Sequence, residues 1–326
     1  MACTPHPRPT DPVPILDTTD PVGAFWRAHR DGRPIALATS GTTSGAPRVI
    51  VRTTASWVDS FPACAGRLGL EASSRFWIPG PMDATMNLFA ACLASSVGAG
   101  WSREPAGCTH AQLTPTGLRR LVDSQSMNGV RALVAGAGLG PDLRQRAERC
   151  GITVDHYYGA AELSLVAWGH DSSDLNLFER VEAELRDGTL WVRSPWLAQV
   201  TTDGRGYATV HDLARLDGDR LEVLGRPGAA TTAGATVALA PIEAALTEHA
   251  RSPVAVLAVP DARLGEVICC VADPADLDAV RRWGRRHLDG PYRPRRWLAR
   301  DPMPLTAAMK IDRRRLATDI SATTTR

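Results

Sequence analysis

The hydrophobic positions of this chain fall into short runs, separated by segments rich in glycine, proline and serine. Two of these runs, residues 35–38 and 49–51, are apolar and have the length of β-strands. Further strands are expected at 76–78, 130–135 and 152–154, and helices at 21–30, 54–68, 82–93 and 142–149. Strands that alternate with helices in this way are typical of an α/β fold.

The pattern changes after about residue 180, where pairs of strands replace the alternation. Residues 181–195 predict an antiparallel hairpin around Asp187-Gly188, and residues 206–226 predict a second one around Asp217-Gly218. The last part of the chain predicts a helix from residue 242, buried strands at 254–259 and 267–271, and a basic, solvent-facing helix at 277–287.

Composition narrows the class of protein. The chain has 326 residues with 44% hydrophobic content, which is enough for two domains with real cores. Its 37 basic and 35 acidic residues give a net charge of +2, so nothing in the total favours nucleic acid or an anionic membrane as a partner. The seven cysteines include no CxxC pair, and no apolar run is long enough for a signal peptide or a membrane span. We expect a cytoplasmic protein.

The polar stretch between the first two strands has the composition of a phosphate-binding loop. Its two glycines let the backbone approach a ligand, and its hydroxyl and amide groups can donate to anionic oxygens. An arginine at its end adds a positive charge. The candidate residues are Thr39, Ser40, Gly41, Thr42, Thr43 and Arg48. The alternative is a Ser/Thr/Gly linker, which is what most such stretches are, and the flanking strands count against it.

Three later stretches carry further candidate chemistry. The small residues 136–138 follow a predicted strand, where a flat ring could lie on the backbone. Residues 156–164 combine aromatic rings with Glu162, and a carboxylate is a preferred ligand of Mg²⁺. Residues 304–313 contain Lys310, which is the only lysine in a chain with 36 arginines. Composition alone does not account for a single lysine at this position.

Together these stretches resemble, in the same order, the motifs of the adenylate-forming superfamily. This superfamily comprises acyl-CoA synthetases, aryl-CoA ligases, luciferases and the adenylation domains of nonribosomal peptide synthetases. The polar loop resembles Thr-Ser-Gly-Thr-Thr-Gly-x-Pro-Lys, and the segment from Tyr158 resembles Tyr-Gly-x-Thr-Glu. The C-terminal stretch matches seven of the eight defined residues of Pro-Leu-Thr-x-x-Gly-Lys-Ile-Asp-Arg. The chain departs from these motifs at Ser44, Arg48, Ala161 and Met309.

The resemblance implies an α/β fold in two domains. Residues 1–225 would form a trimmed ATP- and acyl-binding N-terminal domain with mixed sheets and helices, and residues 226–326 a small mobile α+β domain that carries the catalytic lysine. The phosphate loop begins at residue 39, much earlier than in most of the superfamily, so the usual first subdomain is mostly absent. In this respect the chain resembles compact actinobacterial o-succinylbenzoate-CoA ligase-like and acyl-CoA synthetase-like proteins.

The resemblance also implies roles for single residues. The implied catalytic residues are Lys310, Glu162 and Arg226. The implied cofactor-binding residues outside the phosphate loop are Gly136, Ala137, Gly138, Tyr158, Gly159, Ala161, Asp212 and Gly234. Lys310 would bridge the substrate carboxylate and the α-phosphate of ATP, and Glu162 would hold Mg²⁺. Tyr158 would face the adenine, Asp212 would accept the ribose hydroxyls, and Gly234 would lie along the pantetheine tunnel.

Two residues are candidates for contact with the substrate. Asp83 stands where many amino-acid-activating domains carry an aspartate that pairs with the substrate amine, which implies an amino-substituted carboxylic acid. The alternative is that Asp83 only caps the helix that follows it. His156 is the second candidate, as a residue of the pocket or of the core and without a catalytic role.

The implied reaction is the ATP-dependent activation of a small-molecule carboxylic acid to an acyl-adenylate, with release of pyrophosphate. Mg²⁺ would assist, and the acyl group would then pass to CoA or to the phosphopantetheine of an acyl-carrier protein. One alternative is an adenylating enzyme that passes its product to an amine or activates a non-acyl group. Another is a degenerate, non-catalytic nucleotide- or acyl-binding protein, which Ala161 and the missing first subdomain would favour.

Overall fold

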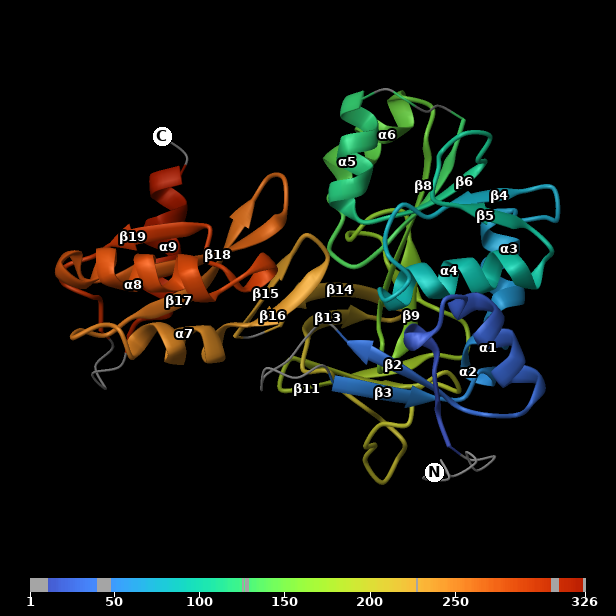
Figure 1. The fold of residues 1–326 in the computed structure, drawn as a ribbon, viewed down its shortest axis with the longest axis horizontal. Coiled ribbons are helices and arrows are strands. Elements are labelled where there is room, and N and C mark those ends of the chain that lie inside the picture. Colours follow the sequence, from blue (N-terminus) through green and yellow to red (C-terminus); the bar gives the residue numbers. More distant parts are fainter. Residues whose placement is uncertain are drawn as a thin grey trace, which may run out of the picture. The chain divides into compact units, whose positions relative to one another are not determined.

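The computed structural model of the chain describes residues 11–39, 48–124, 126, 129–226, 228–305 and 311–324. These residues divide into two compact units, with the boundary between Gly225 and Arg226 (Figure 1). The first unit contains two sheets, and the second unit contains one sheet with helices on both faces.

The smaller sheet of the first unit has, among the described residues, the strand order β1-β2-β3. β2 (Ile35–Thr39) pairs antiparallel with β3 (Arg48–Arg52) and parallel with the short β1 (Val13–Pro14). Between β1 and β2 the chain forms the 3₁₀ turn η1 (Ile15–Asp17) and helix α1 (Pro21–Arg30). The predicted strands at 35–38 and 49–51 and the predicted helix at 21–30 are thus confirmed.

The larger sheet of the first unit has a parallel half and an antiparallel half. In the described part of the chain its order is β11-β12-β13-β14-β10-β9-β8-β7-β6-β4-β5. The parallel half comprises β4 (Arg75–Trp77), β5 (Gly100–Ser102), β6 (His110–Leu113), β7 (Arg131–Val134) and β8 (Thr153–Ala160). The antiparallel half comprises β9 (Ser164–Gly169), β10 (Asn176–Leu177), β11 (Glu182–Arg186), β12 (Thr189–Arg193), β13 (Leu213–Asp217) and β14 (Arg220–Gly225).

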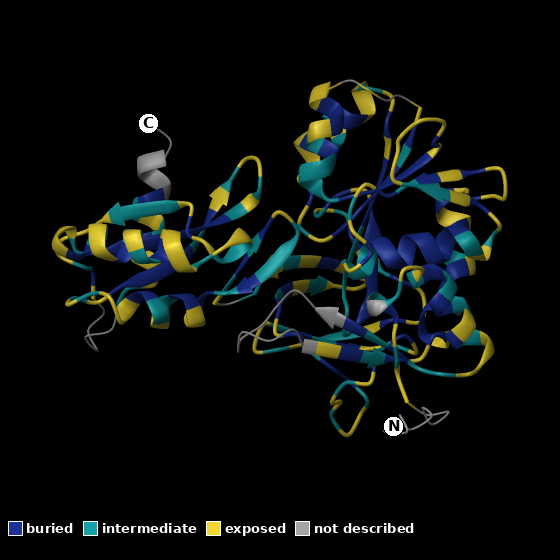
Figure 2. Cartoon of the chain, in the orientation of Figure 1, coloured by how far each residue is buried: buried dark blue, intermediate teal, exposed yellow. Residues whose placement is uncertain are grey.

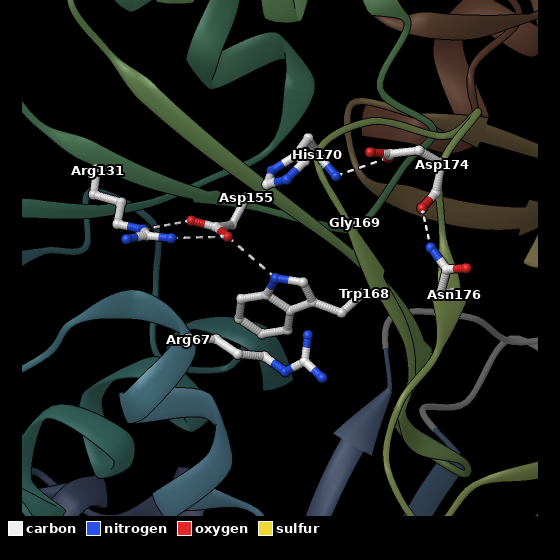
Figure 3. A pocket seen from close by; sticks show the side chains of 8 residues that line it. All are labelled: Arg67, Arg131, Asp155, Trp168, Gly169, His170, Asp174 and Asn176. Carbon is white, nitrogen blue, oxygen red and sulfur yellow. Dashed lines mark hydrogen bonds and ion pairs between the residues drawn. The ribbon is translucent and has the colours of Figure 1, made fainter. Parts of the chain in front are cut away.

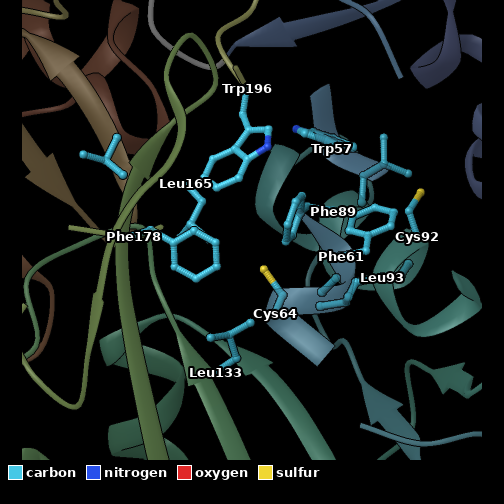
Figure 4. Packing of buried hydrophobic residues seen from close by; sticks show 14 of the residues in the cluster. Trp57, Phe61, Cys64, Phe89, Cys92, Leu93, Leu133, Leu165, Phe178 and Trp196 are labelled. Atoms are coloured by element: carbon cyan, nitrogen blue, oxygen red, sulfur yellow. The ribbon is translucent and has the colours of Figure 1, made fainter. Parts of the chain in front are cut away.

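Helices cover both faces of the parallel half. α5 (Pro115–Ser124) and α6 (Pro141–Arg149) pack on one face. α4 (Thr85–Ser96) packs on the other face, with α2 (Ala55–Val58) and α3 (Phe61–Leu68) beside it. Figure 2 shows that α4 is buried along most of its length, in keeping with its apolar sequence. The core on this side is rich in aromatic rings, including Trp57, Phe61, Phe89, Phe178 and Trp196 (Figure 4).

Several predictions of element bounds were wrong. The helices predicted from residues 242 and 277 begin three residues earlier, at Leu239 and Pro274. Residues 54–68 form two helices, because Pro62 has no amide hydrogen and is accommodated only in the first turn of a new helix, α3. The helix predicted at 82–93 begins three residues later, at Thr85. The first strand of the second hairpin begins at Leu213, not at residue 206.

The second unit is α+β, as predicted. Its described strands are β15 (Ala229–Thr232), β16 (Ala235–Ala238), β17 (Ala255–Asp261), β18 (Gly265–Ala272) and β19 (Arg296–Ala299), in the order β16-β15-β18-β17 with β19 beside β18. α7 (Leu239–Thr247) and α8 (Pro274–His287) pack on one face, and α9 (Arg313–Thr324) packs on the other. A 3₁₀ turn, η2 (Gly290–Tyr292), follows α8. No helix in the described residues of either unit is long and apolar enough to cross a membrane.

Gly284 lets α8 pack closely against the rest of the second unit. A Cβ atom at this position would lie 2.5 Å from Cη2 of Trp297 and 3.2 Å from Cδ2 of Leu246. We expect Gly284→Ala to lower the free energy of unfolding by about 1–3 kcal/mol, because an added methyl group must displace packed neighbours. Gly66→Ala in α3 is the matched control: its Cβ would have no neighbour within 4 Å, so alanine should stabilise that helix by about 0.5–1 kcal/mol. Denaturant unfolding of both variants measures these changes. If Gly284→Ala is as stable as the wild type, the close packing at this position is contradicted.

Candidate active site

The carboxyl ends of β7 and β8 carry several of the predicted nucleotide-binding residues. β7 and β8 are adjacent parallel strands, so the segments that follow them leave the sheet at the same edge. Residues 136–138 follow β7, and Tyr158 and Gly159 lie near the end of β8. Gly136 has a φ of 85°, which glycine adopts without strain. The fold therefore gathers these predicted residues at one edge of the sheet.

Tyr158 and Asp212 are in direct contact. The phenol Oη of Tyr158 donates a hydrogen bond of 2.6 Å to Oδ2 of Asp212, although 54 residues separate the two positions in the chain. Asp212 is only 8% exposed and directly precedes β13, and its carbonyl oxygen accepts a hydrogen bond from the amide of Leu190. Two residues to which the sequence assigned different parts of ATP, the adenine and the ribose, therefore share one site.

His156 stabilises the turn that follows β7. Its Nδ1 donates to the carbonyl oxygen of Val134 at 2.9 Å, and its Nε2 lies 3.3 Å from the hydroxyl of Ser172. The same hydroxyl accepts a hydrogen bond from the amide of Leu139. His156 is 2% exposed, and burial lowers its pKa, so the neutral ring persists. Both ring nitrogens have protein partners, so His156 has a structural place in the core, which is one of the two places expected for it.

Glu162 lies in the tight turn between β8 and β9, with its side chain partly exposed. The amide of Leu163 donates to the carbonyl oxygen of Ala160, and the carbonyl oxygen of Glu162 accepts from the amide of Ala198. Gly159 is necessary for this turn, because a Cβ atom there would lie 2.3 Å from the carbonyl oxygen of Ser164. The backbone of the turn is therefore closely defined on both sides of the carboxylate.

Arg52, at the end of β3, is a neighbour of this turn that the sequence did not single out. The residue is 0% exposed, and its Nη1 donates to the carbonyl oxygen of Ala161 at 3.2 Å. From the sequence alone, an arginine at the end of an apolar strand is expected to face solvent. Its burial depends on segments more than a hundred residues further along the chain, so no local signal could have revealed it.

The phosphate-loop candidates Ser40, Gly41, Thr42 and Thr43 lie outside the described residues, and so does Lys310. The positions that flank them are described. Thr39 and Arg48 pair across β2 and β3, so these two strands enter and leave the loop side by side. In the second unit, Leu305 and Ile311 form an antiparallel bridge on either side of the segment that contains Lys310. The backbone on both sides of each candidate segment is thus paired.

The remaining candidates lie in different surroundings. Asp83 is exposed and precedes α4, whose N-cap is Ala84 without a side-chain hydrogen bond, so the alternative that Asp83 caps this helix was wrong. Arg226 is the first described residue of the second unit. Gly234 has a φ of 88° and follows Ala233 with a φ of 51°, and together they make the two-residue turn between β15 and β16.

A pocket of about 310 Å³ elsewhere in the first unit shares no residue with these candidates. Figure 3 shows its wall, where the buried Asp155 accepts hydrogen bonds from Arg131 at 2.6 Å and from the indole of Trp168 at 3.1 Å. Asp155 lies near the start of β8, whereas the predicted nucleotide residues lie at its end. The described residues contain no cluster of three or more histidine, cysteine or acidic side chains that could hold a metal ion without a ligand's help.

Comparison with known sequences finds relatives but no matching family profile. The chain is 22% identical to an uncharacterised acyl-CoA ligase, YhfT, of Bacillus subtilis, over 94% of the chain and 70% of that protein. It is 26% identical to the 2-succinylbenzoate-CoA ligase of Escherichia coli, over 65% of the chain and 51% of that protein. The chain thus spans 51% to 70% of the length of these relatives.

Solved structures with the same fold are adenylate-forming enzymes. The amide bond synthetase McbA of Marinactinospora thermotolerans, as a K483A mutant, matches 87% of the chain with a TM-score of 0.71 at 22% identity, over 69% of its own length. The o-succinylbenzoate-CoA synthetase of Bacillus subtilis matches the same share with a TM-score of 0.72 at 19% identity. The chain has a shortened adenylate-forming fold, and the resemblance found in its motifs is confirmed. The two relatives named above are an acyl-CoA ligase and a 2-succinylbenzoate-CoA ligase.

Proposed function

We propose that this chain activates a small-molecule carboxylic acid with ATP. A carboxylate oxygen of the acid attacks the α-phosphorus, the bond between that phosphorus and the bridging oxygen breaks, and pyrophosphate leaves with the electron pair. The products are an acyl-adenylate and pyrophosphate. The observation that carries the proposal is the hydrogen bond between Tyr158 and Asp212 at the carboxyl edge of the parallel strands. It supports one nucleoside site built from motifs far apart in the sequence.

Different residues would bind the different parts of ATP and the reacting carboxylate. Residues 136–138 and Tyr158 would hold the adenine, and the acceptor oxygens of Asp212 would hold the ribose hydroxyls. The phosphate loop, with Arg48, would bind the phosphates that leave. Lys310 would place its ammonium between the substrate carboxylate and the α-phosphate, where negative charge develops. The domain assignment follows: residues 1–225 bind ATP and acid, and residues 226–326 supply the lysine.

The chemistry at Glu162 suits Mg²⁺. The ion favours one or two carboxylates together with phosphate oxygens and water, and the single, partly exposed carboxylate of Glu162 meets that need. When bound, Mg²⁺ supplies positive charge that stabilises the phosphates during displacement. Backbone hydrogen bonds on both sides of Glu162 define the position of its Cα before the nucleotide arrives.

The proposed acceptor of the acyl group is a thiol, either of CoA or of the phosphopantetheine on a carrier protein. The two curated relatives named above are CoA ligases, which supports a thiol. A second candidate acceptor is an amine, and the likeness of the fold to an amide bond synthetase favours it. Incubating the chain with ATP, an accepted acid and either CoA or an amine separates the two, because the mass of the product identifies the nucleophile.

A panel of carboxylic acids tests the proposed activity. Pyrophosphate release, with AMP and not ADP as the nucleotide product, is expected for at least one acid. Succinylbenzoate-type aromatic acids belong in the panel because of the relatives. If the chain binds ATP but releases no pyrophosphate with any acid, the alternative of a non-catalytic binding protein is favoured.

Asp83 leads to a prediction about the acid. If its exposed carboxylate pairs with a substrate amine, amino-substituted aromatic acids and β-amino acids should have at least about 10-fold lower KM values than their amine-free analogues, since a charge-assisted pair contributes about 1.5–3 kcal/mol. Asp83→Asn should remove that preference and leave the KM of amine-free acids unchanged. Equal activity with both sets of acids would disprove this role of Asp83.

A further inference from the structure

Arg52 is an ionisable side chain in the core of the first unit. It is 0% exposed. Its guanidinium lies 5.0 Å from the ring centre of Trp57. Burial lowers the pKa of Arg52 to about 9, and the negative charge of Glu162 partly opposes this change. A charged group is costly to keep in such surroundings unless it makes good hydrogen bonds.

The guanidinium makes three hydrogen bonds, all within the protein. Nε donates to the hydroxyl of Ser56 at 3.0 Å, and Nη1 donates to the carbonyl oxygen of Ala161 at 3.2 Å. Nη2 donates to the carbonyl oxygen of Trp196 at 2.6 Å. These acceptors belong to three parts of the chain, at intervals of 4, 109 and 144 residues from Arg52. The side chain therefore joins the end of β3 to two segments that lie far from it in the sequence.

Backbone hydrogen bonds complete the same junction. The amide of Gln199 donates to the carbonyl oxygen of Val51, and the amide of Ala198 donates to the carbonyl oxygen of Glu162. The segment around 196–199 is thus attached both to β3 and to the turn that holds Glu162. β3 is also the strand that leaves the phosphate loop. Arg52 lies where the strand from the phosphate loop meets the turn that carries the proposed magnesium ligand.

We propose that Arg52 is a positioning residue, which holds the Glu162 turn in register with the strand of the phosphate loop so that both can act on one ATP–magnesium complex. The inference rests on the proposed function, since it concerns the same site. Arg52 itself touches no substrate in this account. It acts through the backbone of Ala161, whose carbonyl group adjoins Glu162, and its positive charge lies near that carboxylate.

The test measures ATP affinity by calorimetry, once with magnesium and once with EDTA, in the wild type and in Arg52→Met. Methionine has a similar length and no charge. We expect the magnesium-dependent gain in affinity to fall by about 10-fold or more, as is usual when a residue behind a metal ligand is changed, while affinity in EDTA stays within about 2-fold. Arg52→Lys, which keeps the charge and can still donate, should recover part of the gain.

Arg220→Met is the matched control. Arg220 also donates two hydrogen bonds to a carbonyl oxygen, that of Ser173, but it lies on the surface. Both affinities should be unchanged in this variant. In addition, Arg52→Met should not lower the magnesium-dependent gain in ATP affinity any further in a chain that already carries Glu162→Gln, because both changes act through one carboxylate.

The outcomes distinguish a failure of the proposed function from a failure of the positioning role of Arg52. If the wild type does not bind ATP, the proposed function fails and this inference fails with it. If the wild type shows the magnesium-dependent gain and Arg52→Met keeps it, the inference alone is overturned. An equal loss in magnesium and in EDTA would show a purely structural role and would also overturn it. Should Arg52→Met not fold, Arg52→Lys and Ser56→Ala, which removes the acceptor of Nε, give the same comparison.

Discussion

Replacing Lys310 by alanine is expected to reduce pyrophosphate release by about 10²–10³-fold or more, because the ammonium would neutralise charge that develops in the transition state. ATP affinity should change much less, since the phosphate loop and the nucleoside site remain. Lys310→Arg keeps the charge but not the compact geometry of the ammonium, so we expect only partial activity from it. A Lys310→Ala variant with full pyrophosphate release would remove the central role given to this residue.

The sequence offers an independent test of the same role. Lys310 is the only lysine in the chain, so an amine-selective reagent can modify just this side chain and the terminal amino group. We expect reductive methylation to lower the activity, and ATP together with an accepted acid to protect Lys310 from modification. Peptide mapping by mass spectrometry distinguishes the two amines. Complete methylation of Lys310 at unchanged activity would contradict the role of its ammonium in the reaction.

Glu162→Gln is expected to have the second largest effect, a fall of about 10²-fold in kcat/KM at physiological magnesium. Glutamine has nearly the same shape but lacks the negative charge that holds Mg²⁺. Part of the loss should be regained at higher magnesium, because a weakened metal site is filled by mass action. Glu148→Gln, on the surface beside Arg144, is the control and should not alter activity. Loss of activity that no concentration of magnesium relieves would argue against metal binding at Glu162.

The parts of the fold that could be predicted are those with strong local signals. Proline before an apolar stretch gave α1 its observed start at Pro21. Asp187 and Gly188, with φ values of 50° and 75°, form the predicted turn between β11 and β12. Aspartate and glycine adopt this left-handed backbone conformation more readily than most residues. The family motifs gave the fold class, since their order along the chain is itself specific.

Other parts could not be predicted because they depend on contacts between distant segments. The motifs placed Tyr158 and Asp212 at the same nucleotide, but their hydrogen bond could not be predicted, since the order of strands in the large sheet decides this contact. The buried place of Arg52 has the same origin. His156 was expected in a pocket or the core, and its partners Val134 and Ser172 became apparent only once β7 and β8 were paired.

At Asp83 a local sequence signal was present but predicted the wrong structure. An aspartate just before a helix predicts an N-cap with good physical reason. The helix nevertheless starts after Ala84, and Asp83 has no hydrogen bond or ion pair among the described residues. Its exposed carboxylate is therefore free to meet a ligand, which is why the panel of amino-substituted acids is informative.

The most direct test of the account is calorimetric titration of the chain with ATP in magnesium buffer. The account predicts saturable binding at one site per chain, weakened when Glu162→Gln or Asp212→Asn is introduced and weakened again when magnesium is removed. No detectable ATP binding in magnesium buffer, or binding that neither variant alters, would contradict a nucleotide site at the carboxyl ends of β7 and β8.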